Sequence, residues 1–142
     1  MKKILVPIDG SENSIKALMK AQEIGKLANS DITILFVVND LKNHPYAIDR
    51  THLEQLRKDI NEQSNEIVHK AKTHFAADYP GRVDTLVRTG NVETEILEVS
   101  MSGGYDLIVI GSRGLGRFAK TMLGSTSHKV LNNAEIPVLL IK

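Results

Sequence analysis

Two glycine-rich segments hold the residues whose types and spacing could do chemistry. The first runs from Gly111 to Arg117 (Gly-Ser-Arg-Gly-Leu-Gly-Arg), and the second reads Gly124-Ser125-Thr126-Ser127. Glycines let a backbone turn tightly and present several N–H groups in one direction, and a helix N-terminus favours negative charge. The segment 111–129 also carries four cations and no carboxylate: Arg113, Arg117, Lys120 and Lys129. This composition indicates an anion site, and a solvated loop followed by an ordinary capped helix is the alternative.

Apolar β-rich runs and helical patterns alternate along the chain, and the strands and helices that they predict must position the two glycine-rich segments. Strands are expected over 3–8, 32–38, 83–88, 107–110 and 137–141. Helices are expected from Ser11 to about Ala28, over 51–75, between Asn91 and Gly103, and over 125–132. Five strands alternating with four helices predict an α/β fold, a doubly wound parallel sheet in the order 3-2-1-4-5 with helices on both faces. The whole chain, 1–142, is expected to be one domain.

The carboxyl ends of the strands are where ligands bind in such sheets, at the point where the strand order reverses. In the predicted order these are the loops after strands one and four. The first is Pro7-Ile8-Asp9-Gly10-Ser11, and the second is the glycine-rich segment that begins at Gly111. Asp9 is either a ligand-binding carboxylate or a turn residue that caps the next helix.

The sequence does not fit either of two common phosphate-binding motifs. The P-loop pattern requires Lys-Ser/Thr after Gly116, where Arg117-Phe118 stand. The dinucleotide fingerprint matches Gly114 to Ala119, but only one strand follows and it holds no acid at the required distance.

Composition narrows the function classes. The net charge of +1, the absence of Trp and the presence of only three Phe and three Tyr argue against nucleic acid. There is no cysteine and no apolar run near the ~20 residues of a membrane span, so we expect a cytoplasmic protein that does not bind membranes.

The motif Gly111-x2-Gly114-x9-Gly124-Ser125 resembles the ATP-binding loop of the universal stress protein family, G-x2-G-x9-G-[ST]. The opening Lys3 to Ser11 and the ending Ile136 to Leu140 are similar to that family's start and end. The resemblance implies an adenine nucleotide alpha-hydrolase-like fold and ATP, with or without Mg²⁺, as the ligand. It also implies a set of binding residues: Pro7, Asp9, Val37, Ile110, Gly111, Ser112, Arg113, Gly114, Gly124, Ser125 and Thr126.

The function expected from this resemblance is an ATP-binding regulatory module of the stress response. Asp9 is the one plausible acid near the predicted site, so no catalytic residues are assigned and efficient turnover is not expected. A slow ATP hydrolase or phosphotransfer protein and a nucleotide-free interaction dimer are the alternatives. The family resemblance and the apolar edge strand Val138 to Ile141 predict a homodimer.

Overall fold

A computed structural model of the chain describes residues 1–39, 49–114 and 122–142. Its strands are β1 (Lys3–Ile8), β2 (Asp31–Asn39), β3 (Val83–Gly90), β4 (Leu107–Gly111) and β5 (Val138–Ile141). Its helices are α1 (Glu12–Ala28), α2 (Arg50–Lys72), α3 (Val92–Ser102) and α4 (Ser125–Asn133). The predicted elements are all present, and their boundaries differ from the prediction by a few residues.

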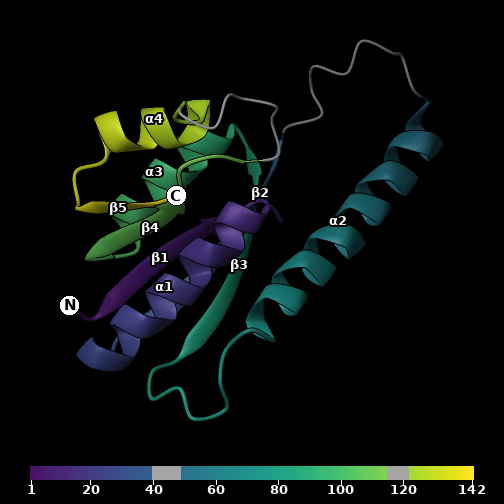
Figure 1. Cartoon of the computed structure of the whole chain (residues 1–142). Coiled ribbons are helices and arrows are strands. Elements are labelled where there is room, and N and C mark those ends of the chain that lie inside the picture. The colour runs from purple at the N-terminus through teal and green to yellow at the C-terminus, as the bar shows by residue number, and fades with distance from the viewer. Residues whose placement is uncertain (40–48, 115–121) are drawn as a thin grey trace.

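The strands form one parallel sheet in the order β3-β2-β1-β4-β5 (Figure 1). The predicted fold class and strand order are therefore confirmed. β1 lies in the centre, with Ile4 opposite Ile32 of β2 and opposite Leu107 of β4. The strand order reverses between β1 and β4, so the loops that follow these two strands leave the same edge of the sheet side by side.

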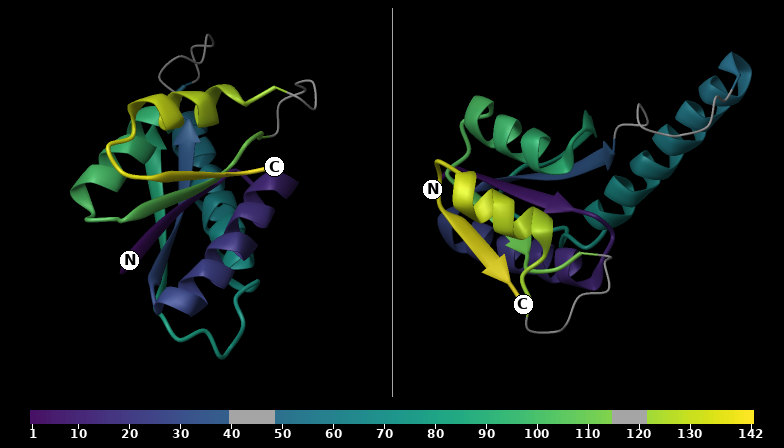
Figure 2. Two further views of the ribbon diagram at one scale, coloured as in Figure 1. Left: turned by 60° about the vertical axis from the view of Figure 1, so that its left-hand side comes forward. Right: turned by 90° about the horizontal axis from the view of Figure 1, so that it is seen from above.

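The helices cover both faces of the sheet, α1 and α2 on one and α3 and α4 on the other (Figures 1 and 2). Alternate residues of β1 point to opposite faces: Ile4 packs in the cluster with α1 and α2, and Leu5 packs in the cluster with α3 and α4. Both side chains are fully buried. Double coverage explains why the central strands are apolar without interruption.

α2 is longer than the sheet can cover. Its 23 residues span about 35 Å, whereas the eight residues of β3 span about 26 Å. Only its C-terminal half is buried, at Ser64, Val68 and Ala71. The predicted apolar face continues through Leu53, Leu56 and Ile60, but these are only half-buried because that half of α2 extends beyond the sheet (Figure 1). The helix also ends at Lys72 and not at Phe75, which packs on the core from the following turn.

Within the described ranges, no helix combines the length and the apolar character that a membrane span requires.

Candidate functional site

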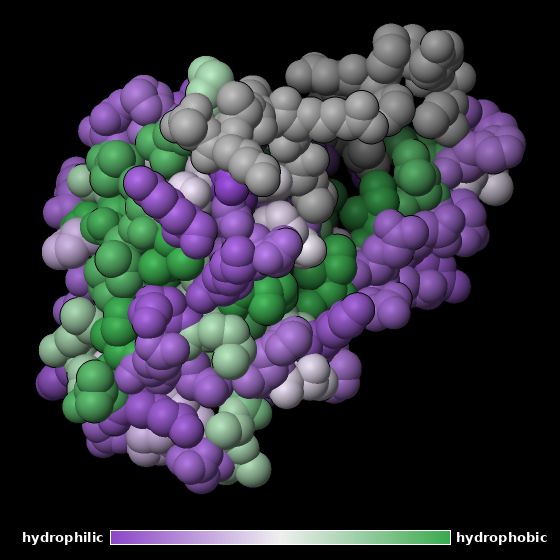
Figure 3. Space-filling model, in the orientation of Figure 1, coloured by the Kyte–Doolittle hydropathy of each residue, from purple (hydrophilic) through white to green (hydrophobic). Residues whose placement is uncertain are grey.

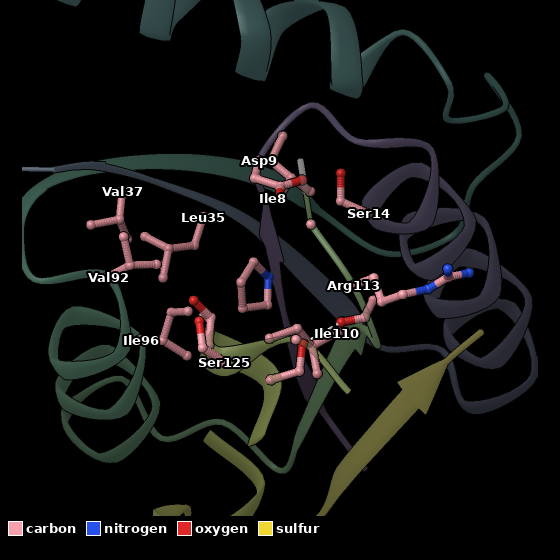
Figure 4. A pocket seen from close by; sticks show the side chains of 16 residues that line it. Ile8, Asp9, Ser14, Leu35, Val37, Val92, Ile96, Ile110, Arg113 and Ser125 are labelled. Atoms are coloured by element: carbon pink, nitrogen blue, oxygen red, sulfur yellow. Dashed lines mark hydrogen bonds between the residues drawn. The ribbon is translucent and has the colours of Figure 1, made fainter. Parts of the chain in front are cut away.

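A pocket of about 340 Å³ lies at the carboxyl edge of the sheet, where the ends of β1, β2 and β4 meet the starts of α3 and α4 (Figure 4). This volume is in the range of small-molecule sites. Ten of the eleven predicted binding residues line it: Pro7, Asp9, Val37, Ile110, Gly111, Arg113, Gly114, Gly124, Ser125 and Thr126. Residues far apart in the sequence thus meet around one cavity, as the family pattern predicted, although their contact with a ligand stays a prediction.

Ser112 is the predicted residue that does not line the pocket. Its backbone N–H donates to the carbonyl of Ile141 at 2.7 Å, and its own carbonyl accepts from the N–H of Gly124 at 2.7 Å. The side chain is buried as well. Its backbone groups thus join β4 to β5 and to the start of α4, and its predicted contact with phosphate stays a prediction.

Six residues that the sequence did not single out also line the pocket: Ile8, Ser14, Leu35, Val92, Ile96 and Ser127. A signal existed for some of them. Leu35 stands two residues before Val37 and therefore points to the same face of β2. Val92 and Ile96 are one helical turn apart at the start of α3, so they share one side of that helix.

One side of the pocket is apolar. Leu35, Val37, Val92 and Ile96 gather there, whereas Arg113 lies on the opposite side with its guanidinium directed away from them (Figure 4). Leu35 and Ile96 are almost wholly buried and so form a firm wall. We call these four residues the apolar wall. A flat aromatic base could pack against it, since binding pockets are commonly lined by apolar side chains with a few polar groups that fix orientation.

The start of α4 lies at the same pocket, and its cap differs from those of the other helices. A capping residue precedes each of α1, α2 and α3, and its side chain accepts a hydrogen bond from a backbone N–H of the first turn: Ser11, Asp49 and Asn91. The residue in this position before α4 is Gly124, which has no side chain that could accept such a bond. The first N–H groups of a helix lack partners within it, and they attract anions. Ser125, Thr126 and Ser127 therefore present a polar, partly positive end to the pocket.

Hydrogen bonds hold this helix start against the end of β4. The N–H of Gly124 donates to Ser112, and the hydroxyl of Ser127 donates to the carbonyl of Gly111 at 2.6 Å. Both anchors are short and buried or nearly so. The start of α4 is thereby fixed relative to the sheet without using its free amides.

Asp9 is a turn residue that also lines the pocket, and its contact with a ligand stays a prediction. Its Oδ1 accepts from the backbone N–H of Ser11 at 2.9 Å, which forms the turn before α1, while Ser11 itself is the helix cap. Its Oδ2 lies against Gly114, and a Cβ atom at position 114 would overlap that oxygen. Asp9 is also a pocket residue, so its carboxylate is available to a ligand from a fixed turn.

The two described cations of the glycine-rich region, Arg113 and Lys129, have different surroundings. Arg113 lines the pocket, whereas Arg117 and Lys120 lie outside the described residues. Lys129 is directed elsewhere: its Nζ donates to Oε1 of Glu93 at 2.9 Å. This hydrogen bond, followed by smaller contributions, holds the pKa of Glu93 below its ordinary value. One of the four positive charges of the segment 111–129 is therefore paired with a carboxylate of α3, which lies outside that segment.

Within 1–39, 49–114 and 122–142 there is no group of three or more His, Asp or Glu side chains that could hold a metal ion by themselves. Among the described residues that line the pocket, Asp9 supplies the single carboxylate. A Mg²⁺ ion carried by phosphates would suit such a site, because Mg²⁺ keeps several waters and commonly uses one or two carboxylates.

Comparison with known proteins agrees with the sequence motifs. A model of the universal stress protein family matches residues 1–142. The chain belongs to the universal stress protein family. It is 33% identical to the universal stress protein YxiE of Bacillus subtilis, and the alignment covers 99% of this chain and 98% of the relative.

Solved structures show the same architecture. The universal stress protein UspA from Lactobacillus plantarum superposes with a TM-score of 0.87 at 25% identity, covering 99% of this chain and 97% of that protein. A universal stress protein family protein from Arabidopsis thaliana, with AMP bound, superposes with a TM-score of 0.66 at 20% identity, covering 100% of this chain and 92% of that one. The universal stress protein fold therefore extends over the entire length of this chain.

Proposed function

We propose that this universal stress protein binds ATP in the pocket at the carboxyl edge of the sheet and acts as a nucleotide-dependent regulatory module. One observation carries the proposal: an apolar wall and an uncapped helix N-terminus face the same cavity. The two ends suit the two parts of a nucleotide. The base would pack on Leu35, Val37 and Val92, and the phosphates would accept hydrogen bonds from the first N–H groups of α4.

The remaining pocket residues fit between these ends. Pro7, Asp9 and Ile110 would border the ribose, and Gly111, Arg113 and Gly114 would border the phosphates. Gly124, Ser125 and Thr126 would complete the phosphate site, with two side-chain hydroxyls added to the helix amides. A Mg²⁺ ion carried by the phosphates would find its protein ligand in Asp9. The AMP bound to the structural relative from Arabidopsis thaliana supports an adenine nucleotide as the ligand class.

Calorimetric titration of the nucleotide-stripped protein with ATP and Mg²⁺ tests this proposal, beside a Gly114→Ala variant. The added methyl group meets the Asp9 carboxylate, which is tied to Ser11, so we expect a loss of at least tenfold in ATP affinity from this displacement (~1.4 kcal/mol). Circular dichroism should show that the variant is folded. A folded wild-type protein that binds no ATP would refute the proposal and favour a nucleotide-free interaction dimer.

Regulation requires that the nucleotide state change a surface, and β5 offers one. This strand is at the edge of the sheet, and its residues from Val138 to Ile141 are all only half-buried. Figure 3 shows apolar side chains gathered over the region of β5 and α4. Leu131, a residue of α4, is 42% exposed. An open apolar edge invites pairing with a second copy through a two-fold axis. A cytoplasmic homodimer is the form we propose, and sedimentation of a monomer at micromolar concentration, with and without ATP, would refute it.

A slow ATP hydrolase is the second candidate, because the Asp9 carboxylate at the ribose border faces Gly114, which would border the phosphates. That carboxylate could hold Mg²⁺ or orient a water molecule. Phosphate release that Asp9→Asn abolishes, while ATP still binds, would favour the hydrolase over a purely regulatory protein.

A further inference from the structure

The ion pair between Glu93 and Lys129 joins the two helices that begin at the pocket. Glu93 is in the first turn of α3, Lys129 is in the second turn of α4, and the two residues are 36 positions apart. The side chain of Glu93 is only 14% exposed, whereas that of Lys129 is 60% exposed. Among the described residues it is the ion pair that links α3 to α4. A carboxylate so well covered holds its partner in a narrower range of positions than a solvated surface pair does.

Each member of the pair stands next to residues that line the pocket. Val92 precedes Glu93 in the sequence, and Ile96 follows it by one helical turn, so Glu93 is set between two members of the apolar wall. On α4, Ser125 and Thr126 are one turn before Lys129. The pair therefore connects the apolar wall to the helix start proposed to bind phosphate.

The core beneath the pair does not make it redundant. Val130 of α4 packs with Ile96 and Val99 in one buried cluster, which fixes the two helices deeper in the molecule. Apolar contacts are not directional, so a small rotation of a helix end costs little free energy. A charge-assisted hydrogen bond of 2.9 Å at the first turn of α3 adds the missing directional constraint at the pocket itself.

We propose that Glu93 and Lys129 are positioning residues, which hold the apolar wall at the distance from α4 that the nucleoside requires. The inference rests on the proposed function, since it assigns the wall to the base. Lys129 has a competing role as a direct phosphate ligand, but it is engaged by Glu93 and does not line the pocket. A positioning role of Lys129 predicts that its loss weakens adenosine binding, whereas a role as phosphate ligand predicts that its loss weakens tripolyphosphate binding.

The test compares adenosine, tripolyphosphate and ATP binding by the full chain and by Glu93→Gln, Lys129→Met and Lys129→Arg. Breaking the pair should weaken adenosine and ATP binding by roughly three- to tenfold and leave tripolyphosphate binding unchanged. Lys129→Arg keeps the ion pair, so its affinities for adenosine and ATP should equal those of the wild-type protein. The double variant Glu93→Gln, Lys129→Met should lose no more than either single variant, since both remove one interaction.

A matched control is Asp78→Asn, which removes the ion pair with Lys26 at the C-terminal end of α1, at the opposite edge of the sheet. It should change none of the three affinities. Unchanged adenosine binding in Glu93→Gln, or a selective loss of tripolyphosphate binding in Lys129→Met, would overturn the positioning role. A wild-type protein that binds neither adenosine nor ATP would instead remove the proposed function, and this inference with it.

Discussion

Replacing Gly124 by aspartate tests whether phosphate binds at the start of α4. Gly124 has φ −62° and ψ 152°, an extended conformation that every residue can adopt. A Cβ atom there would lie 3.3 Å from the carbonyl oxygen of Ser112, so only a small adjustment is needed. Aspartate is a preferred helix cap, and its carboxylate would accept from the same N–H groups that the proposal gives to phosphate. The variant should therefore be at least as stable as the wild-type protein and yet bind ATP poorly.

The size of the effect follows from charge. Two unit charges 4 Å apart interact with about 4 kcal/mol at an effective dielectric constant near 20. Salt and displacement of the ligand reduce this repulsion, so we expect a loss of about 2–3 kcal/mol, or roughly 30- to 150-fold in ATP affinity. Gly124→Asn is the matched control because it occupies the same amides without a charge. This variant should lower the ATP affinity about tenfold or less, which corresponds to the net free energy of one hydrogen bond.

Calorimetric titration with ATP and thermal unfolding of both variants provide the two readouts. The expected result is an aspartate variant that binds ATP well below the asparagine variant, with melting temperatures at or above that of the wild-type protein. Equal ATP affinity in the two variants would mean that no phosphate charge approaches the start of α4. The proposed orientation of the nucleotide would then be wrong, whatever its affinity.

Three further predictions concern the structure around the site and its frame. Ile96→Ala should lower the free energy of unfolding by about 2–5 kcal/mol in urea titrations, because Ile96, a member of the apolar wall, is 1% exposed and packs in the core. Tyr79→Phe should cost about 1 kcal/mol in the same assay, since the hydroxyl of Tyr79 donates to the carbonyl of Ser30 at 2.6 Å. The backbone N–H groups of Lys2 and then Lys3 lower the pKa of Asp106 below its usual 3.8, so its contribution is present above that value and lost as the pH falls through the lower folded-state pKa. Asp106→Asn should therefore unfold at lower urea than the wild-type protein at pH 7, and the difference should shrink as the pH falls through the lowered pKa of Asp106.

The fold was predictable because each level of the sequence points the same way. Nearly continuous apolar runs such as Ile32 to Val38 suit strands that are covered on both faces, and alternation with helices leaves few possible topologies. The burial of α2 was predicted incorrectly, because it depends on the length of the sheet beneath the helix. The pattern of α2 continues into its exposed half, because a helix keeps its periodicity after the sheet beneath it has ended.

The candidate site was predictable where local backbone defines it and not where distant groups decide. Ser112 lies inside the glycine motif, but the carbonyl of Ile141 at the end of β5 takes its N–H group. Lys129 counts as a free cation in the sequence, and only the packing of α3 on α4 brings Glu93 to it. Ile141 and Glu93 are both outside the motif in the sequence, so no local pattern could have indicated these two contacts.

The three glycines of the Gly111-Gly114-Gly124 motif have three different physical reasons, and only one concerns a helix start. A Cβ atom at Gly111 would lie 2.8 Å from the backbone carbon of Asn13, so this glycine lets the end of β4 approach α1. Gly114 makes room for the Asp9 carboxylate, and both contacts bring the loops after β1 and β4 together. Gly124 leaves the amides of α4 without a cap. The motif thus lets the connection between β4 and α4 approach α1 and the Asp9 carboxylate at its beginning, and it leaves the amides of α4 open to the pocket at its end.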